Sequence, residues 1–444
     1  MEEKKTALGK TEESREWEEI REGRLFFDGC DLTELAEKFG TPLYIVSQSG
    51  IEARVEELKQ DFLQTYEKTR VAYAAKAFCI KAILQLMEKH RFCIDVVSGG
   101  ELYTAIAAGF PPERIEFNGN NKLAEELEMA VDYGIGRIII DGLSELSQIE
   151  EICRRKKKKM KVLYRITPGV KSDSHDYIVT GKKDSKFGIP LDDDILLPEV
   201  KKALDSDFVE FLGLHFHVGS QLFDNQSHLQ ALNVVLAVAE KIKNAFQFDM
   251  KELNLGGGFG ARYTKEKRRP YSYFLDPMMK RIEEFYRQQG VPRPEVVIEP
   301  GRSIVAEAGM ELYRIGNIKK IPGVRTYVSV DGGMSDNLRP MLYQAVYDGI
   351  LANKADQPAE EEVTVCGKCC ESGDVLIKDI KLAQPQSGDI LAVRSTGAYG
   401  YSMASNYNKN PIPAVVFVKD GQARLAVRRQ SYEELLEREE ALDF

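Results

Sequence analysis

Eight short apolar runs, rich in Val, Ile and aromatic residues, alternate with longer amphipathic segments between residues 48 and 305. The runs are RVAYAAK, FCIDVVS, RIEFNG, RIIID, KVLYRITPG, FLGLHFHVGS, ELNLGGG and EVVIEPG. Such runs are typical of buried strands, and the segments between them have the period of helices. The alternation predicts a (β/α)8 barrel of the TIM type over residues 48–305. An open doubly wound sheet is the alternative, because alternation alone does not close a barrel.

The pattern changes after the last of these runs. Residues 306–444 contain strand-like pieces separated by Gly, Pro and Asp, without regular helical segments, which predicts an antiparallel β domain. Residues 24–47 include the run RLFFDGCDL, which predicts a strand that could belong to either domain, and we expect it to join the β domain. Residues 1–23 match no pattern of folded structure and are expected to be a flexible extension.

Composition and charge exclude several classes of function. The formal net charge of -9 does not favour a general nucleic-acid surface. No apolar stretch is long enough to cross a bilayer, and the N-terminus lacks an export segment, so we expect a cytoplasmic protein. The seven cysteines are scattered and odd in number, which predicts reduced thiols. A C-x-x-C pair at Cys366 and Cys369 has no second pair at a suitable spacing, so no metal site is expected.

Polar residues gather where the predicted barrel strands end. Catalytic groups of such barrels project from the C-terminal strand ends and the loops just beyond them. Charged groups inside the barrel would be costly, so their clustering at one rim indicates a site. The residues at these ends are Lys76, Asp95, Asn118, His215, His217, Gly256 to Gly258, Glu299 and Arg302.

The stretch LNLGGGFG places three consecutive glycines, Gly256, Gly257 and Gly258, after the seventh run. Without Cβ atoms, their backbone N–H groups can approach an anionic oxygen closely. A tight turn between strand and loop is the alternative interpretation. Barrels often bind phosphate after the seventh strand, and this position favours a phosphate site.

A strand-end lysine, a phosphate cradle, a histidine and a strand-end acid together suit pyridoxal 5'-phosphate. The Lys76 amine would form an imine with the aldehyde, and the glycines would hold the phosphate. Glu299 would keep the pyridine nitrogen protonated, so that the ring can accept electrons. Each residue alone would more often be solvated or structural, and the combination carries the hypothesis.

The chain resembles the diaminopimelate decarboxylases, which are pyridoxal-phosphate enzymes of the alanine-racemase-like barrel class. The resemblance implies a barrel joined to a β domain that the N-terminal segment completes. It also implies a head-to-tail homodimer with active sites at the interface. Eleven motifs in order carry it: AYAAKAF, DVVSGGEL, NGNNK, RITPGV, TGKKDSKFGI, GLHFHVGSQ, LNLGGGFG, EPGRSIVAEAG, VDGGMSDNLRPMLY, CESGD and GAYGYSMASNYN.

The resemblance assigns roles around the cofactor. Lys76 would be the lysine that bonds to the cofactor, and His217 would stack on its ring. Asp95 and Glu101 match motif positions near the cofactor. One departure is Phe78, where many members of the family have Asn. The implied cofactor-binding set is Lys76, Asp95, His217, Ser220, Gly256, Gly257, Gly258, Glu299, Gly301, Arg302 and Tyr399.

The resemblance also assigns residues to a substrate with two amino-acid heads. Arg302 and Arg339 would grip the distal carboxylate in forked geometry, and Glu371 would take the distal ammonium. Cys370 matches the thiol that returns a proton after carbon dioxide leaves, and with Glu371 it would reach the partner subunit's site. The implied substrate-binding set is Arg302, Arg339, Tyr343, Glu371 and Tyr399, and the implied catalytic set is Lys76, Cys370 and His217.

The function implied is decarboxylation of meso-2,6-diaminopimelate at its D-centre, giving L-lysine and carbon dioxide in the last step of lysine biosynthesis. Gln344 stands where ornithine decarboxylases of this fold have an aspartate, and Arg339 also favours a distal carboxylate. A decarboxylase of a related diamino or carboxylated polyamine acid is the alternative. An alanine-racemase-like activity and a non-catalytic binding protein are less favoured, because both leave several of these residues without a role.

Overall fold

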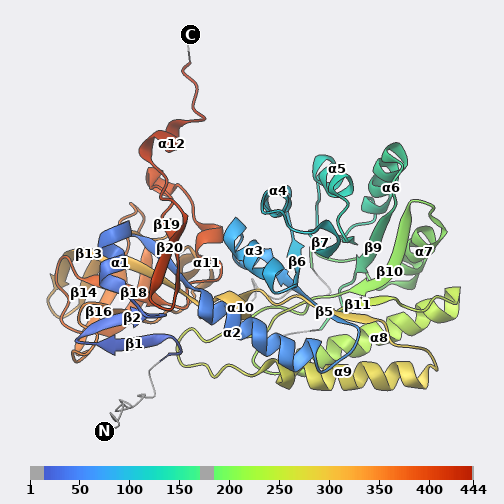
Figure 1. Ribbon diagram of the computed structural model, residues 1–444, viewed down its shortest axis with the longest axis horizontal. Coiled ribbons are helices and arrows are strands. Elements are labelled where there is room, and N and C mark those ends of the chain that lie inside the picture. Colours follow the sequence, from blue (N-terminus) through green and yellow to red (C-terminus); the bar gives the residue numbers. More distant parts are fainter. Residues whose placement is uncertain (1–14, 171–184, 443–444) are drawn as a thin grey trace, which may run out of the picture. The chain divides into compact units, whose positions relative to one another are not determined.

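The structure is a computed structural model that describes residues 15–170 and 185–442. The chain forms two compact units (Figure 1). One contains the described residues up to Ala53 and those from Glu307 onward, and the other is the segment Arg54–Ala306. Residues 1–14, assigned above to an extension, and residues 180–184 of the motif TGKKDSKFGI lie outside the described ranges.

The second unit is a closed barrel of eight parallel strands, which confirms the predicted fold and rules out the open sheet. Each of the eight apolar runs contributes one strand. The first strand pairs with the last, since Val297 is in register with Arg70. The strands are β5 (Thr69–Ala74), β6 (Cys93–Val96), β7 (Ile115–Phe117), β8 (Arg137–Ile140), β9 (Met160–Arg165), β10 (Val209–His215), β11 (Glu252–Asn254) and β12 (Glu295–Ile298).

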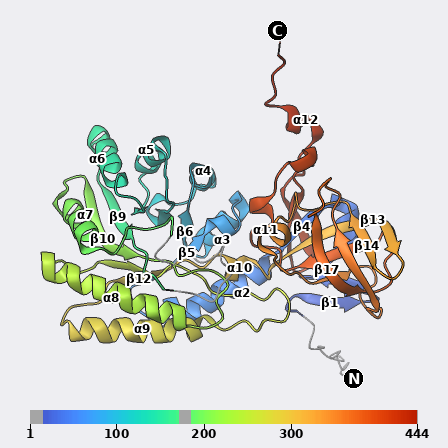
Figure 2. The same cartoon turned by 180° about the vertical axis from the view of Figure 1, so that it is seen from behind.

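Helices connect successive strands and surround the barrel (Figure 2). They bury one apolar face each, as Leu232, Val235 and Leu236 do on α8. The connecting helices are α3 (Lys81–Lys89), α4 (Gly99–Ala107), α5 (Ala124–Tyr133), α6 (Glu145–Lys156), α7 (Asp193–Asp205), α8 (Gln226–Phe246) and α9 (Tyr271–Gln288), with α2 (Gln48–Leu58) before β5 and the short α10 (Arg302–Val305) after β12.

An ion-paired layer lies at the N-terminal ends of the barrel strands. Arg70 Nη2 is 2.8 Å from Glu252 Oε1, and Arg137 Nε is 3.1 Å from Glu252 Oε2. All three residues are largely buried, so removing one partner would leave an uncompensated charge at a cost of about 3–5 kcal/mol. This end of the barrel is therefore structural.

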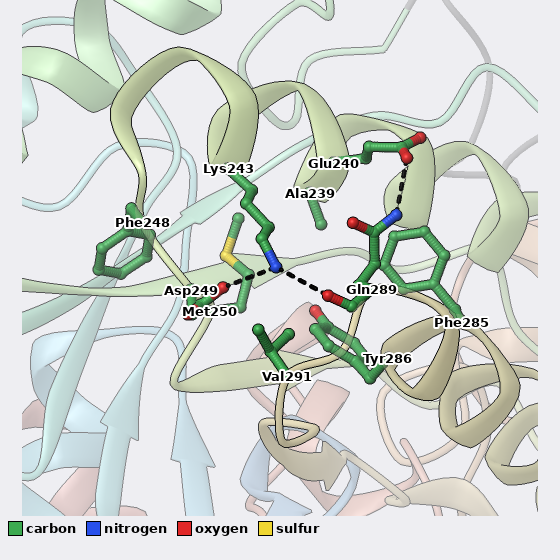
Figure 3. A pocket seen from close by; sticks show the side chains of 10 residues that line it. All are labelled: Ala239, Glu240, Lys243, Phe248, Asp249, Met250, Phe285, Tyr286, Gln289 and Val291. Atoms are coloured by element: carbon green, nitrogen blue, oxygen red, sulfur yellow. Dashed lines mark hydrogen bonds and ion pairs between the residues drawn. The ribbon is translucent and has the colours of Figure 1, made fainter.

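A pocket at the same end of the barrel is also structural (Figure 3). It is lined by α8, α9 and the residues just before β11 and β12. Lys243 Nζ lies 3.3 Å from Asp249 Oδ1 and donates to the Gln289 carbonyl, and Gln289 donates to Glu240. Its charged groups already hydrogen-bond or pair with one another, and no C-terminal strand end reaches it. The functional site is therefore expected at the opposite rim, where the C-terminal ends of the strands lie.

The first unit is built on a nine-stranded, mostly antiparallel sheet. β4 (Leu43–Ser47) lies between β13 and β19, antiparallel to the former and parallel to the latter. The N-terminal segment therefore completes the β domain, as predicted. The other strands are β13 (Gly309–Ile321), β14 (Arg325–Val330), β15 (Gly349–Leu351), β16 (Glu361–Cys366), β17 (Val375–Leu382), β18 (Ile390–Arg394), β19 (Ala414–Lys419) and β20 (Gln422–Val427).

The beginning of the described chain differs from the sequence prediction. β1 (Glu18–Arg21) pairs with β2 (Arg24–Phe27), so residues 18–23 form a hairpin rather than an extension. Glu18 Oε2 lies 2.7 Å from Arg394 Nη2, which ties this strand to the core of the unit. The run RLFFDGCDL forms β2 and β3 (Cys30–Asp31) of a separate three-stranded sheet, and the strand that enters the large sheet is β4. No helix among residues 15–170 and 185–442 is long and apolar enough to span a membrane.

Candidate active site

Lys76 lies in a single 3-10 turn, Ala75–Ala77, directly after β5. Its neighbours Ala75 and Ala77 are buried, while Lys76 itself is exposed at the rim. The turn is closed by Phe78, whose N–H donates to the Ala75 carbonyl and whose carbonyl accepts from the Tyr73 hydroxyl at 2.8 Å. Both contacts use the backbone of Phe78, so they do not depend on the buried side chain that departs from the family pattern.

Glu299, at the end of β12, is a buried carboxylate surrounded by donors. Its Oε1 accepts from Asn254 Nδ2 at 2.8 Å and from Asn118 Nδ2 at 3.2 Å. Its Oε2 lies 3.1 Å from His215 Nε2. Burial alone would raise the pKa of Glu299, but the charge and hydrogen bond of His215 outweigh it and hold this pKa well below its usual range. Glu299 is therefore ionised.

Two neighbouring acids have pKa values shifted in the opposite direction. Burial and the charge of Glu299 raise the pKa of Asp95 well above its usual value, and the same two causes raise the pKa of Glu116. One carboxyl oxygen from each of the three residues lies within 4.8 Å of the other two. Like charges this close cannot all persist in a buried site. The single negative charge therefore lies on Glu299, with Asp95 and Glu116 protonated.

His217, just beyond β10, is held as a neutral imidazole. Burial lowers its pKa well below the usual value, and the positive charges of Lys76 and Arg165 lower it further. The N–H of Gly257 donates to Nδ1 at 3.2 Å, which leaves the proton on Nε2. A neutral ring with one fixed orientation is suited to stacking on a flat ligand.

The three glycines after β11 are required by their surroundings. A Cβ on Gly257 would lie 2.2 Å from the Glu299 carbonyl oxygen, and Gly258 has a φ of +110°. His228 Nε2, on α8, lies 3.1 Å from the Gly257 carbonyl, which ties the loop to that helix. The N–H groups of Gly258 and Gly301 donate to no acceptor within the described ranges. These donors are available to an anionic oxygen.

Ser220 and Arg302 lie together beside this loop. Arg302 Nη2 and Nε donate to Ser220 Oγ at 2.9 and 3.1 Å, and Arg302 Nη1 donates to the Tyr263 hydroxyl at 2.7 Å. Arg302 is buried at 7% exposure. The guanidinium and the hydroxyl therefore form one group that can bind a phosphate or a carboxylate.

Replacing Gly257 with alanine is expected to weaken cofactor binding strongly. The added Cβ would overlap the Glu299 carbonyl and displace both the loop and the end of β12, at a cost of about 1–3 kcal/mol. The dissociation constant for pyridoxal phosphate should rise about tenfold or more, measured by equilibrium dialysis. Gly142→Ala is the control, because a Cβ there meets no atom within 4 Å. Equal affinity in the two variants would contradict the assignment of this loop.

The remaining predicted residues lie in the first unit. Arg339 and Tyr343 begin and end the short helix α11 (Arg339–Tyr343). The Arg339 guanidinium lies over the Tyr347 ring, 5.6 Å from its centroid, and donates to the Tyr347 hydroxyl. Tyr399 has a φ of +62° in the loop that follows β18. Strain of this kind in a non-glycine residue is typical of functional loops.

Cys370 and Glu371 are exposed on the loop between β16 and β17. The Asp374 carboxylate holds this loop in place, because it accepts from the N–H groups of Cys369 at 2.8 Å and Met334 at 2.7 Å. The Cys370 N–H donates to Asn408 Oδ1 at 2.7 Å. A rigid base therefore presents both side chains outward.

Several residues of the site were missed by sequence reasoning. Asn254 bridges to Glu299, Arg165 lies over the Phe187 ring at 4.4 Å, and His228 holds the glycine loop. Asn254 and Arg165 end β11 and β9, so the rule of polar strand ends could have identified them. His228 lies on a helix face, where no local signal distinguishes it. Glu101 was expected near the cofactor, and its side chain accepts from the Val97 N–H at 2.9 Å at the start of α4.

Comparisons with known proteins agree with this geometry. Residues 50–306 match the pyridoxal-dependent decarboxylase family over its pyridoxal binding domain. A diaminopimelate decarboxylase of Bacillus subtilis is 47% identical over 93% of this chain and 94% of its own. One from Staphylococcus aureus is 41% identical over 93% of this chain and 97% of its own. The crystal structure of the M. jannaschii diaminopimelate decarboxylase with L-lysine has a TM-score of 0.90 at 36% identity and covers 96% of this chain and 98% of its own.

The barrel residues fit pyridoxal phosphate. A glycine loop with available N–H groups suits its phosphate, and an ionised acid suits a protonated pyridine nitrogen. The neutral ring of His217 suits the cofactor face, and exposed Lys76 suits the aldehyde.

Proposed function

The chain belongs to the diaminopimelate decarboxylases of the pyridoxal-dependent decarboxylase family, and we propose that it decarboxylates meso-2,6-diaminopimelate at the D-centre to give L-lysine. It is a pyridoxal-phosphate-dependent carboxy-lyase of lysine biosynthesis. The observation that carries the proposal is the charge pattern at the barrel rim. Glu299 is a buried carboxylate that accepts from Asn254 and Asn118 and lies 3.1 Å from His215 Nε2, and a protonated pyridine nitrogen requires one such ionised acid beside it.

Bound pyridoxal phosphate supplies an electron sink for the bond to the departing carboxylate. Lys76 would hold the cofactor through its aldehyde. The Glu299 carboxylate keeps a proton on the pyridine nitrogen, and His215 with the two asparagines keeps Glu299 ionised. The neutral imidazole of His217 supports the ring face. Ser220 and the glycine loop hold the phosphate, and the loop beginning at Gly301 approaches the same group.

The residues of the first unit complete the proposal at the distal end of the substrate. Arg339, with Arg302, binds the distal carboxylate, and Glu371 takes the distal ammonium. Tyr343 and Tyr399 contact the substrate, and Tyr399 also contacts the cofactor. The Cys370 thiol returns a proton to the carbon that lost its carboxylate. Cys370 and its loop are exposed, which supports a role toward a second subunit of a homodimer.

The first test is release of carbon dioxide by purified protein with pyridoxal phosphate. We expect release from meso-diaminopimelate and none from ornithine, arginine or carboxynorspermidine, because the proposed arginine pair requires a distal carboxylate near the second amine. Release from carboxynorspermidine instead would favour the second candidate, a decarboxylase of carboxylated polyamines. If the protein bound pyridoxal phosphate but released carbon dioxide from none of these four compounds, the assignments of fold and cofactor would stand and the proposed substrate would be rejected.

A mixing experiment tests the shared active site. Subunits carrying Lys76→Ala and subunits carrying Cys370→Ala are each expected to be inactive alone. In a mixed pool, half of the dimers would pair unlike subunits, and each of these would hold one intact site. Activity should therefore recover to about a quarter of the unmodified level. No recovery, with mixed dimers shown by native mass spectrometry, would contradict an interface site.

All seven cysteines are free thiols, and four of them, Cys30, Cys93, Cys153 and Cys366, lie at buried or half-buried positions of strands or helices. Free thiols of this number suit a reducing compartment. We place the enzyme in the cytoplasm on this ground. Diagonal electrophoresis without reductant would show disulfide-linked species if the placement were wrong.

A further inference from the structure

Glu311, on β13, is a buried acid outside the site described above. It is 1% exposed, and its partner in register on the neighbouring strand is Tyr44 of β4. A buried carboxyl group is costly unless it is hydrogen-bonded or neutral. The adjacent residues Met310 and Leu312 face the other side of the sheet, so Glu311 shares its own face of β13 with Tyr313.

Glu311 is linked to the segment that carries Arg339. Its Oε2 accepts from the Tyr313 hydroxyl at 2.8 Å and from Asn337 Nδ2 at 3.2 Å. Asn337 Oδ1 in turn accepts from the Arg339 N–H at 3.4 Å, at the start of α11. The orientation of Asn337, and with it the start of this helix, therefore depends on Glu311.

Glu311 also meets the segment that carries Tyr399. A Cβ on Gly400 would lie 2.8 Å from Glu311 Oε1, so the backbone beside Tyr399 packs directly on the carboxyl group. This Oε1 has no hydrogen-bond partner among the residues that the structure describes. On the same side, the Tyr44 and Tyr401 rings pack edge to face with centroids 5.7 Å apart. One buried carboxyl thus contacts two segments of the chain.

We propose that Glu311 is a positioning residue that fixes Arg339 and Tyr399 for the distal end of the substrate, and that it does so in its protonated form. The inference rests on the proposed function, since it takes the distal carboxylate as the ligand of Arg339. The proposal adds Glu311 to the residues on which activity depends, although Glu311 touches neither substrate nor cofactor.

The charge state of Glu311 follows from the groups that face it. Burial raises its pKa to about 8, and Asp336 acts in the same direction, while Tyr313, Asn337 and Arg339 lower it. Tyr44 faces it from β4. At pH 7 the group is therefore mostly neutral. Above pH 8 its carboxylate attracts the Arg339 guanidinium and competes with the carboxylate of the substrate.

The test compares Glu311→Gln and Glu311→Leu with unmodified enzyme, and uses Glu362→Gln as the control because Glu362 is exposed on β16. The measured quantities are KM and kcat for meso-diaminopimelate between about pH 6 and pH 9. Glutamine keeps the neutral shape of the protonated acid, and leucine removes the acceptor of Tyr313 and Asn337. Titration of the substrate and cofactor is common to all four proteins and cancels in the ratios.

We expect KM of the unmodified enzyme, divided by KM of Glu311→Gln, to be near one at pH 7 and to rise severalfold above pH 8. Glu311→Leu should raise KM about tenfold at pH 7 with kcat changed less than about threefold. Glu362→Gln should follow the unmodified enzyme. A constant ratio for Glu311→Gln would overturn the proposal even if Glu311→Leu failed to fold.

A second readout does not depend on catalysis. The pKa of Glu311 is raised on folding, so its contribution to stability is full below the unfolded value of about 4.5 and is lost as the pH rises to about 8. The urea midpoint of the unmodified protein should therefore fall over this range relative to Glu311→Gln. A parallel course of the two curves would refute a protonated Glu311. A different result would be that the two urea-midpoint curves diverge but none of the four proteins releases carbon dioxide. That result would reject the proposed function, and with it the positioning role.

Discussion

Lys76→Ala is expected to abolish release of carbon dioxide, with a loss in kcat on the order of 10³-fold or more. The alanine removes the only amine of the Ala75–Ala77 turn, which is the group proposed to bond to the cofactor. The fold should persist, because Lys76 is exposed and the turn is closed by Phe78 and Tyr73 through contacts that do not involve the lysine side chain. The measurements are carbon dioxide release and cofactor retained after gel filtration.

Lys81→Ala provides a matched control for this prediction. Lys81 is also exposed and begins α3, five residues further along the chain. Its replacement removes the same charge from the same part of the surface, so any effect on long-range attraction of an anionic cofactor would appear in both variants. Substantial activity in Lys76→Ala, or an equal loss in both variants, would show that Lys76 does not bond to the cofactor.

The barrel was predictable because its pattern is local and repeated. Each apolar run had a length suited to one strand, and a helix-forming segment separated each run from the next, so single errors could not change the architecture. The β domain was harder to predict. Asp379 has a φ of +53° inside β17 and shifts its register, which breaks the alternation that marks a strand. β15 has only three residues, too few for any periodic signal.

The residues of the site were predictable in position but not in charge. The rule that polar groups gather at strand ends identified Lys76, Asp95 and Glu299, because register in a parallel barrel brings these ends together. It did not distinguish the two acids, which have opposite pKa shifts. That difference arises mainly from His215, which contacts Glu299 across the barrel and is remote from it in sequence. Such contacts appear only once the barrel is closed.

Glu299→Gln is expected to reduce kcat by about 10²- to 10³-fold while leaving the fold intact. Glutamine preserves the shape and can still accept from Asn254, but it cannot carry the negative charge that keeps the pyridine nitrogen protonated. The loss should fall mainly on kcat, because the phosphate is held by the separate group around Ser220 and the glycine loop. Steady-state kinetics and equilibrium dialysis of pyridoxal phosphate would measure the two effects.

Asp95→Asn is the informative counterpart, because Asp95 belongs to the same cluster and lies within 4.8 Å of Glu299. Asp95 is already neutral, and asparagine can still accept the hydrogen bond that Asn118 gives to its Oδ1 at 2.7 Å. We therefore expect this variant to lose less than about tenfold in kcat, since no charge is removed. Equal losses in the two variants would mean that the negative charge is shared between the acids. A larger loss in Asp95→Asn would place the charge on Asp95 and reverse the roles assigned to the pair.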